Sequence, residues 1–218
     1  MKINSLIYCL IIPSIILANN LENKLIMHPK INETEVLQNM REIKPKKDFS
    51  KLDKRYDFSE EALLKFNSWI DSTLKDSKNN DKNAIIVDKS EYKLYLINKG
   101  EIIKEYFIEL GFNPFQDKLK KGDGCTPEGI YEIAEKKEWS LYHKALLLNY
   151  PNKKDRTEGK TGSLIELHGG GSGKKGNKEG NNWTLGCIAV SNLDIDEIYK
   201  IIQKKEWITV VKYNNILN

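Results

Sequence analysis

The spacing of hydrophobic and polar positions changes twice along the chain and divides it into three parts. In the first part, residues 3–17 are almost all apolar, with Met1 and Lys2 before them and Ala18 after them. A short basic start, an apolar stretch too short to span a bilayer well and a small residue at its end are typical of a secretory signal peptide. We therefore expect residues 1–18 to be a signal peptide, with an uncleaved membrane anchor as the alternative.

Residues 19–83 are polar and rich in lysine, and one helical pattern lies within them. Apolar side chains recur at helical spacing after Ser59, a residue type that caps helix N-termini. They are Leu63, Leu64, Phe66, Trp69, Ile70 and Leu74. The polar run 77–83 ends the pattern, so we expect residues 19–83 to form a helical, partly disordered appendage that packs against the next domain.

From Ala84 the pattern changes to short β-branched and aromatic runs separated by turns. The runs cover residues 84–88, 92–97, 102–108, 129–134, 145–149, 164–168, 187–190 and 207–211. A helix is expected over 193–204, with Asn192 as its cap. Many short strands with one or two helices predict a mainly β domain, a β-sandwich or barrel, over residues 84–214.

Charge and composition exclude several classes of partner. The 35 basic and 31 acidic residues give a net charge of only +4, dispersed along the chain, so nucleic acid is not an expected partner. After residue 18 there is no apolar run that could cross a bilayer. Contact with a membrane is therefore expected only through the signal segment, if that segment stays uncleaved.

Candidate chemistry is concentrated in two short apolar runs, each with a reactive side chain at one end. His168 closes the first run and is followed by a glycine-rich loop, and Gly186 directly precedes Cys187 in the second. A cysteine nucleophile needs a base close enough to take its proton. Gly186 permits a tight turn that exposes the sulfur, and amides around Gly186 and Cys187 could form an oxyanion hole. We predict Cys187 as the nucleophile and His168 as the general base.

Other short motifs carry less weight. Residues 171–176 match the spacing of a dinucleotide-binding loop, but the polar, glycine-containing run after them cannot form the helix that such a loop requires. Residues 159–161 lack the upstream glycine of a phosphate loop. The three histidines have no second histidine or cysteine at ligand spacing, so neither a metal nor another cofactor is expected.

Four blocks in order resemble the catalytic domain of the L,D-transpeptidase family, which acts on the bacterial cell wall. They are residues 121–131, residues 149–152 with Asp155, residues 166–169, and residues 184–190. The resemblance covers about residues 84–213 and implies a mostly β fold. It also implies an exported enzyme of the periplasm or cell envelope that takes part in peptidoglycan biosynthesis, wall organisation and cell shape.

The resemblance implies a mechanism as well. Cys187 would attack the carbonyl of meso-diaminopimelate in a peptidoglycan stem peptide, and His168 would take the thiol proton. The backbone carbonyl of Gly169 would orient the imidazole. The acyl group would then pass to an amine of a second stem peptide, to a protein lysine of a wall-linked protein, or to water. Tyr150, Asn182 and Trp183 are candidate substrate contacts, although Trp183 could equally pack the domain.

The chain departs from much of the family at Ala189, two positions after the nucleophile, where an arginine is common. Alanine cannot make the bidentate carboxylate contact of an arginine. Lys121, Arg156 and Lys160 are other candidates for that contact. A branch of the family with a small residue here includes hydrolases, so an L,D-carboxypeptidase, or an amidase that releases wall-linked protein, remains an alternative.

Two alternatives of other classes remain. If residues 1–18 are removed, Cys125 and Cys187 are the two remaining cysteines, and exported proteins often form disulfides. A Cys125–Cys187 disulfide would make the domain a non-catalytic wall-binding module. A cysteine peptidase with protein substrates is the third possibility and the least favoured.

Overall fold

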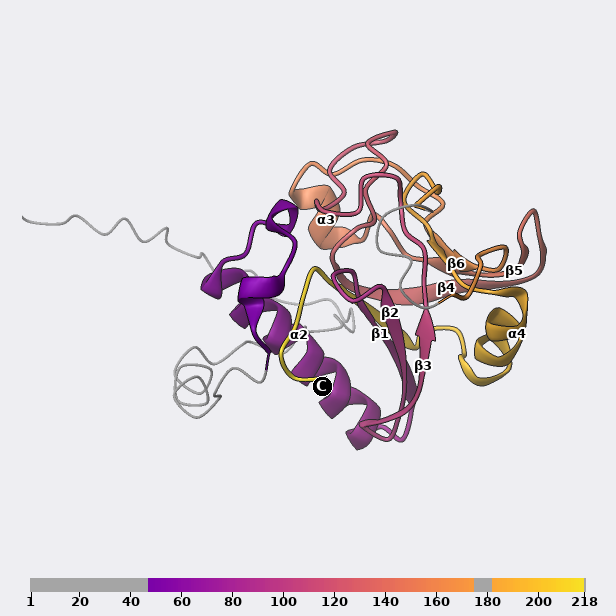
Figure 1. Ribbon diagram of the computed structural model, residues 1–218. Coiled ribbons are helices and arrows are strands. Elements are labelled where there is room, and N and C mark those ends of the chain that lie inside the picture. The colour runs from indigo at the N-terminus through magenta and orange to yellow at the C-terminus, as the bar shows by residue number, and fades with distance from the viewer. Residues whose placement is uncertain (1–46, 175–181, 218) are drawn as a thin grey trace, which may run out of the picture.

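The computed structural model describes residues 47–174 and 182–217, and these form one curled β-sheet with helices on its two faces (Figure 1). Its strands are β1 (Asn83–Asp88), β2 (Lys93–Asn98), β3 (Glu101–Phe107), β4 (Gly129–Ser140), β5 (His143–Leu148), β6 (Glu166–His168), β7 (Ile188–Ala189) and β8 (Trp207–Val211). The α-helices are α2 (Glu60–Asn79), α3 (Lys153–Thr157) and α4 (Asn192–Ile201), and short 3-10 turns cover Phe49–Lys51 and Lys54–Tyr56. The mainly β prediction is confirmed.

The sheet has the order β3-β2-β1-β8-β4-β5-β6-β7, and β4 is the strand that curls it. The first residues of β4 pair with β8 and its later residues pair with β5, with irregular register at Ile133/Glu135. A long strand that passes from one half of a sheet to the other turns the two halves face to face. Isolated bridges from Glu109 to Ala189 and from Gly111 to Thr184 then join the two ends of the curl.

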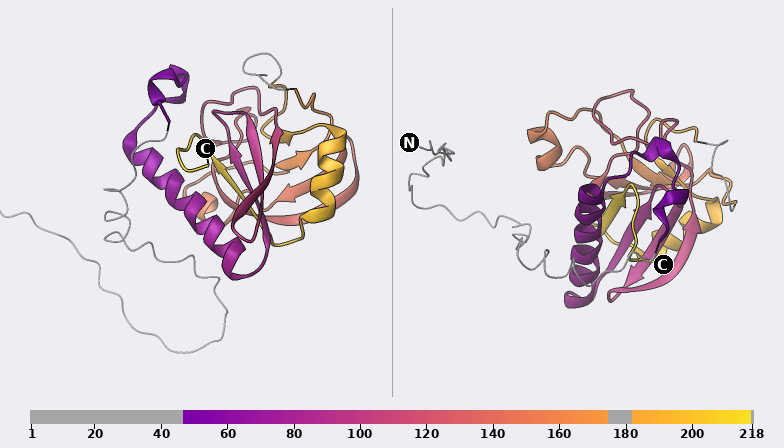
Figure 2. Two further views of the ribbon diagram at one scale, coloured as in Figure 1. Left: turned by 60° about the horizontal axis from the view of Figure 1, so that its bottom comes forward. Right: turned by 60° about the vertical axis from the view of Figure 1, so that its left-hand side comes forward.

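Two apolar cores lie on opposite faces of β1. Ile85 and Val87 belong to the core inside the curl, together with residues of α4, whereas Ala84 and Ile86 face a second core that includes α2. Figure 2 shows α2 and α4 on opposite sides of the strands. Because both faces of β1 are buried, its sequence is apolar without alternation.

The N-terminal helix is packed into the domain, as its apolar pattern predicts. The side chain of Ser59 caps α2 by accepting from the amide of Ala62. Ile70 is fully buried, and Thr73 forms a 2.6 Å hydrogen bond with Thr209 of β8. Residues 47–79 therefore share a core with the sheet rather than forming a separate unit.

The prediction for the C-terminal helix is corrected at both ends. Ser191, not Asn192, is its N-cap, because the Ser191 side chain accepts from the amide of Asp194. Asn192 is already helical, and its side-chain oxygen instead accepts from the amide of Gly170 at 2.8 Å. The helix ends at Ile201 rather than at residue 204.

The expected signal peptide and the start of the appendage lie within residues 1–46, outside the described residues. Across the part of the chain that the structure does describe, no helix combines the length and apolar character needed to cross a bilayer.

Candidate active site

His168 is the last residue of β6, and Cys187 directly precedes the neighbouring strand β7 at the end of the curled sheet. Strand β6 pairs in parallel with β7, with Leu167 opposite Ile188 and His168 opposite Ala189. Side chains two residues apart on a strand share a face, so Cys187 and His168 are diagonal neighbours on one face. From strand spacing, their Cα atoms lie about 8 Å apart, which allows the two side chains to approach.

A glycine with positive φ sets the turn that presents the sulfur. Gly186 has a φ of +128°, which side-chain-bearing residues rarely adopt, and a Cβ there would lie 2.5 Å from the carbonyl oxygen of Cys125. Thr184 holds the same turn, because its hydroxyl accepts from the amide of Gly186 at 3.1 Å and donates to the carbonyl of Cys187 at 2.8 Å. The backbone around Cys187 is therefore fixed by its neighbours before substrate binds.

The thiol of Cys187 is protonated in the resting site. It donates to the carbonyl of Leu164 at 3.5 Å and accepts from the amide of Glu166 at 3.4 Å. Burial raises the pKa of the thiol, against a smaller lowering by the Glu166 amide. The site therefore needs a base to form the thiolate at neutral pH.

His168 has the tautomer that such a base requires. Its Nδ1 lies 2.6 Å from the carbonyl oxygen of Gly169, which can only accept, so Nδ1 carries the proton and Nε2 keeps its lone pair. The side chain is 1% exposed, and burial lowers the pKa of the imidazole. His168 is consequently neutral at pH 7 and able to accept a proton.

Two aromatic residues enclose the imidazole. Tyr142 stacks on His168 with ring centroids 4.8 Å apart, and Trp183 meets it edge-on at 5.7 Å. The two aromatic rings also contact each other at 4.9 Å. Trp183 was expected from the sequence, but Tyr142 was not, because it lies in the turn between β4 and β5 and no local pattern marks it.

The thiol and the imidazole open onto one cavity of about 530 Å³. Its lining is largely apolar and comes from four segments, residues 118–122, 140–142, 162–168 and 183–187. Leu141, Leu164 and Leu185 are each more than half exposed at its rim. A cavity of this size and polarity suits a peptide-sized ligand.

The structure corrects two of the expected substrate contacts. Tyr150 is 4% exposed, does not line the cavity, and packs on Tyr131 with its hydroxyl donating to the carbonyl of Thr161. Asn182 also lies outside the cavity, because its amide donates to the hydroxyl of Tyr92 and accepts from the amide of Leu110. Both residues therefore hydrogen-bond to segments outside the cavity rather than pointing into it.

The expected oxyanion donor is corrected as well. The Gly186 amide already donates to Thr184, so it is not free to receive an oxyanion. The next amide, that of Cys187, has no hydrogen-bond acceptor among the described residues. It is the better candidate donor at this turn.

Of the three expected carboxylate-binding cations, one reaches the cavity. Lys121 lines it, together with Lys118, which is held by Asp123 at 2.8 Å. Lys160 is instead buried against Asp117 at 2.7 Å, and Arg156 donates to the carbonyl of Pro151. Lys121 is therefore the cation best placed for a substrate carboxylate.

Both cysteines of the described chain are free thiols, and Cys125 is buried. The Cys125–Cys187 disulfide of the wall-binding alternative is therefore absent from the structure. Within residues 47–174 and 182–217, no cluster of three or more histidine, cysteine or acidic side chains is arranged to hold a metal ion.

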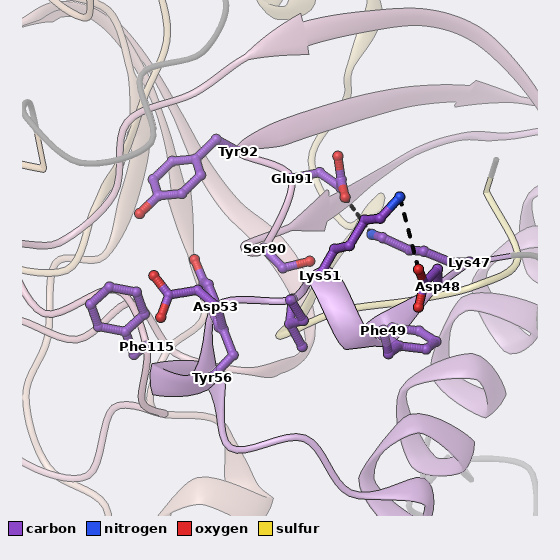
Figure 3. Close-up of a pocket in the computed structure, with 11 residues that line it drawn as sticks. Lys47, Asp48, Phe49, Lys51, Asp53, Tyr56, Ser90, Glu91, Tyr92 and Phe115 are labelled. Carbon is purple, nitrogen blue, oxygen red and sulfur yellow. Dashed lines mark ion pairs between the residues drawn. The ribbon is translucent and has the colours of Figure 1, made fainter.

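A second cavity, of about 520 Å³, lies under the N-terminal turns (Figure 3). Phe115, Tyr56 and Tyr92 line one side, and ion pairs that include Lys47 with Glu91 at 2.5 Å lie on the other. It contains no thiol or imidazole. The hydroxyl of Tyr92, which lines this cavity, accepts from the side-chain amide of Asn182, the residue before Trp183.

Comparison with known proteins identifies the family of the domain. The family model YkuD, described as the L,D-transpeptidase catalytic domain, matches residues 82–210. YafK of Escherichia coli (strain K12), which has a provisional L,D-transpeptidase name, is 32% identical over 87 residues, covering 39% of this chain and 31% of YafK. The match thus spans about a third of that relative's length.

Solved structures with similar folds include two proteins of other bacteria. A mutant of the helical cell shape determining protein Pgp2 from Campylobacter jejuni is 28% identical with a TM-score of 0.48, covering 66% of this chain and 55% of that one. Bd1075 from Bdellovibrio bacteriovorus is 30% identical with a TM-score of 0.47, covering 61% and 49%. Because the family model matches more than half of the 218 residues, the chain belongs to the YkuD family of L,D-transpeptidase catalytic domains.

Proposed function

We propose that the protein is an exported, peptidoglycan-modifying cysteine enzyme of the periplasm or cell envelope. It acts as an L,D-transpeptidase at meso-diaminopimelate in stem peptides. The observation that carries this proposal is that Cys187 and His168, with Nδ1 of His168 held by Gly169, open onto one peptide-sized cavity. Membership of the family supplies the substrate class.

The first half-reaction forms a thioester. Sγ of Cys187 attacks the carbonyl carbon of diaminopimelate while Nε2 of His168 takes the thiol proton. The amide of Cys187 stabilises the negative charge on the carbonyl oxygen. His168 then returns the proton to the leaving amine, and D-alanine departs. The raised pKa of the thiol and the lowered pKa of the imidazole keep both groups neutral until this transfer.

The second half-reaction transfers the acyl group. The amine of a second stem peptide attacks the thioester carbonyl, His168 takes the proton from that amine, and the thiol of Cys187 is regenerated. Of the two lysines that line the cavity, Lys118 is paired with Asp123, so Lys121 is assigned to a substrate carboxylate.

A hydrolytic reaction is the second candidate, because position 189 holds a buried alanine where much of the family has arginine. Water would then replace the amine, giving an L,D-carboxypeptidase, or an amidase that releases a wall-linked protein. Both reactions share the thioester, so Cys187 and His168 keep the same roles.

Product analysis with purified muropeptides tests the proposal and separates its two forms. Mass spectrometry should detect new 3→3 cross-links for transpeptidation, or trimmed tripeptides for hydrolysis. Released peptide fragments from protein-bearing muropeptides would indicate the amidase. Cys187→Ala, which leaves the backbone hydrogen bonds of the turn intact, is the inactive control. Folded wild-type protein that yields none of these products would refute the proposal.

A further inference from the structure

A buried acidic residue outside the cavity lining ties the active-site segments together. Glu109 follows β3 and is 4% exposed. The backbone amides of Glu109 and Ala189 each donate to the other residue's carbonyl oxygen, with both N···O distances 2.8 Å. Because Ala189 also lies opposite His168 in the sheet, the three residues form a row across adjacent strands. Glu109 is therefore anchored to the strand that follows the nucleophile.

The carboxylate of Glu109 joins both ends of the segment between the base and the nucleophile. Its Oε1 accepts from the amide of Ser172 at 2.9 Å, and its Oε2 accepts from Nε1 of Trp183 at 2.7 Å. Ser172 follows His168 by four residues, and Trp183 precedes Cys187 by four. Trp183 in turn contacts the imidazole of His168.

We infer that Glu109 is a positioning residue: its carboxylate fixes the indole of Trp183 against His168 and so keeps the imidazole enclosed and correctly placed. The assignment of His168 as the base rests on the proposed function. The placement of the ring by Glu109 does not, and it can be measured without turnover.

A carboxylate is the group that this position requires. The amide of Ser172 and Nε1 of Trp183 both donate to it, and a carboxylate offers an acceptor oxygen to each. A glutamine of the same shape has one acceptor oxygen, and its NH2 group would face the second donor. Glu109→Gln therefore removes the acceptor of either Ser172 or Trp183 with little change in volume, and leaving that N–H without an acceptor is unfavourable.

The consequence for His168 has a definite sign. Burial is the main cause of its lowered pKa, so loosening Trp183 should admit water and raise that pKa. Loss of the Glu109 charge alone would instead lower it, because a nearby anion favours the imidazolium. Among the described residues, the ionisable groups that face the imidazole are Tyr142 from the β4–β5 turn, Glu166 with its partner Lys137, and Cys187, and the substitution leaves them unchanged.

The test compares Glu109→Gln, Trp183→Phe and the double variant by NMR titration of His168 in the purified chain. Only three histidines are present, so a His168→Gln spectrum assigns the signal. We expect both single variants to raise the pKa of His168. We also expect kcat with muropeptide to fall on the order of tenfold to a hundredfold, with little change in KM. The kcat of the double variant should be no lower than that of the less active single variant, because Glu109 acts on His168 through Trp183.

The matched control is Glu128→Gln. Glu128 is also a buried carboxylate, but it pairs with Lys89, at an N–O distance of 2.9 Å, and does not line the active-site cavity. It should lose stability and leave the pKa of His168 unchanged. A Glu109→Gln variant whose His168 pKa stays constant or falls, or whose effects add to those of Trp183→Phe, would overturn the inference. If the pKa shifts as expected but wild-type protein shows no turnover, the proposed function fails and the positioning role stands.

Discussion

Replacing Gly186 by alanine tests the turn that presents the nucleophile. The added Cβ would lie 2.5 Å from the carbonyl oxygen of Cys125 and 3.2 Å from Cδ1 of Ile165, at a φ of +128°. The first contact is with backbone, which cannot rotate away as a side chain would. Backbone strain of this kind costs about 1–3 kcal/mol, and overpacking a filled site costs about another 1–3 kcal/mol. We therefore expect Gly186→Ala to lower the free energy of unfolding by about 2–6 kcal/mol.

Gly159→Ala is the matched control. Gly159 has a φ of +75°, and a Cβ there would meet no atom within 4 Å, so only the left-handed backbone contributes. The expected loss is about 1–2 kcal/mol. Urea unfolding of both variants at one pH, with equal m-values, measures the difference. Equal losses of unfolding free energy in the two variants would refute the reasoning, because the close contact between a Cβ at position 186 and the carbonyl of Cys125 would then cost nothing.

Three further perturbations have defined outcomes. Because burial raises the pKa of Cys187, iodoacetamide should label it slowly at pH 7 and faster as the pH rises beyond the usual thiol range, as followed by peptide mass spectrometry; a rate that is already maximal below pH 7 would contradict this. Lys89→Ala should cost about 3–5 kcal/mol in urea unfolding, because it leaves the carboxylate of Glu128 buried and unpaired. Ile70→Ala should cost about 2–5 kcal/mol in a single transition, and a loss near zero would mean that α2 folds apart from the sheet.

The parts of the fold that could be predicted are those with local signals. Ser59 and the apolar spacing after it predicted α2, since the cap and the apolar face of the helix lie in one continuous stretch of sequence. The runs that became β1 and β2 were equally clear. The first residue of α4 was not clear from the sequence, because the choice between Ser191 and Asn192 as N-cap depends on backbone angles and on the hydrogen-bond partner of each side chain.

The residues of the site likewise fall into those that local sequence predicts and those that it does not. His168 and Cys187 were recognisable because one ends and the other begins an apolar run beside glycine, but their neighbours come from distant segments. Tyr142 reaches the imidazole from the β4–β5 turn, and Glu109 from the segment after β3. Tyr150 stood in a motif-like block and yet is buried, because its ring fills space beside Tyr131. Such placements depend on the curl of the sheet, which no short segment encodes.

The central claim is that Cys187 carries the acyl group of a stem peptide. Intact-mass spectrometry and peptide mapping, after incubation with a tetrapeptide stem that ends in diaminopimelate and D-alanine, test it most directly. The account predicts an acyl adduct on Cys187 with release of D-alanine, and neither in Cys187→Ala. An adduct on Cys125, or release of D-alanine by Cys187→Ala at the wild-type rate, would contradict it.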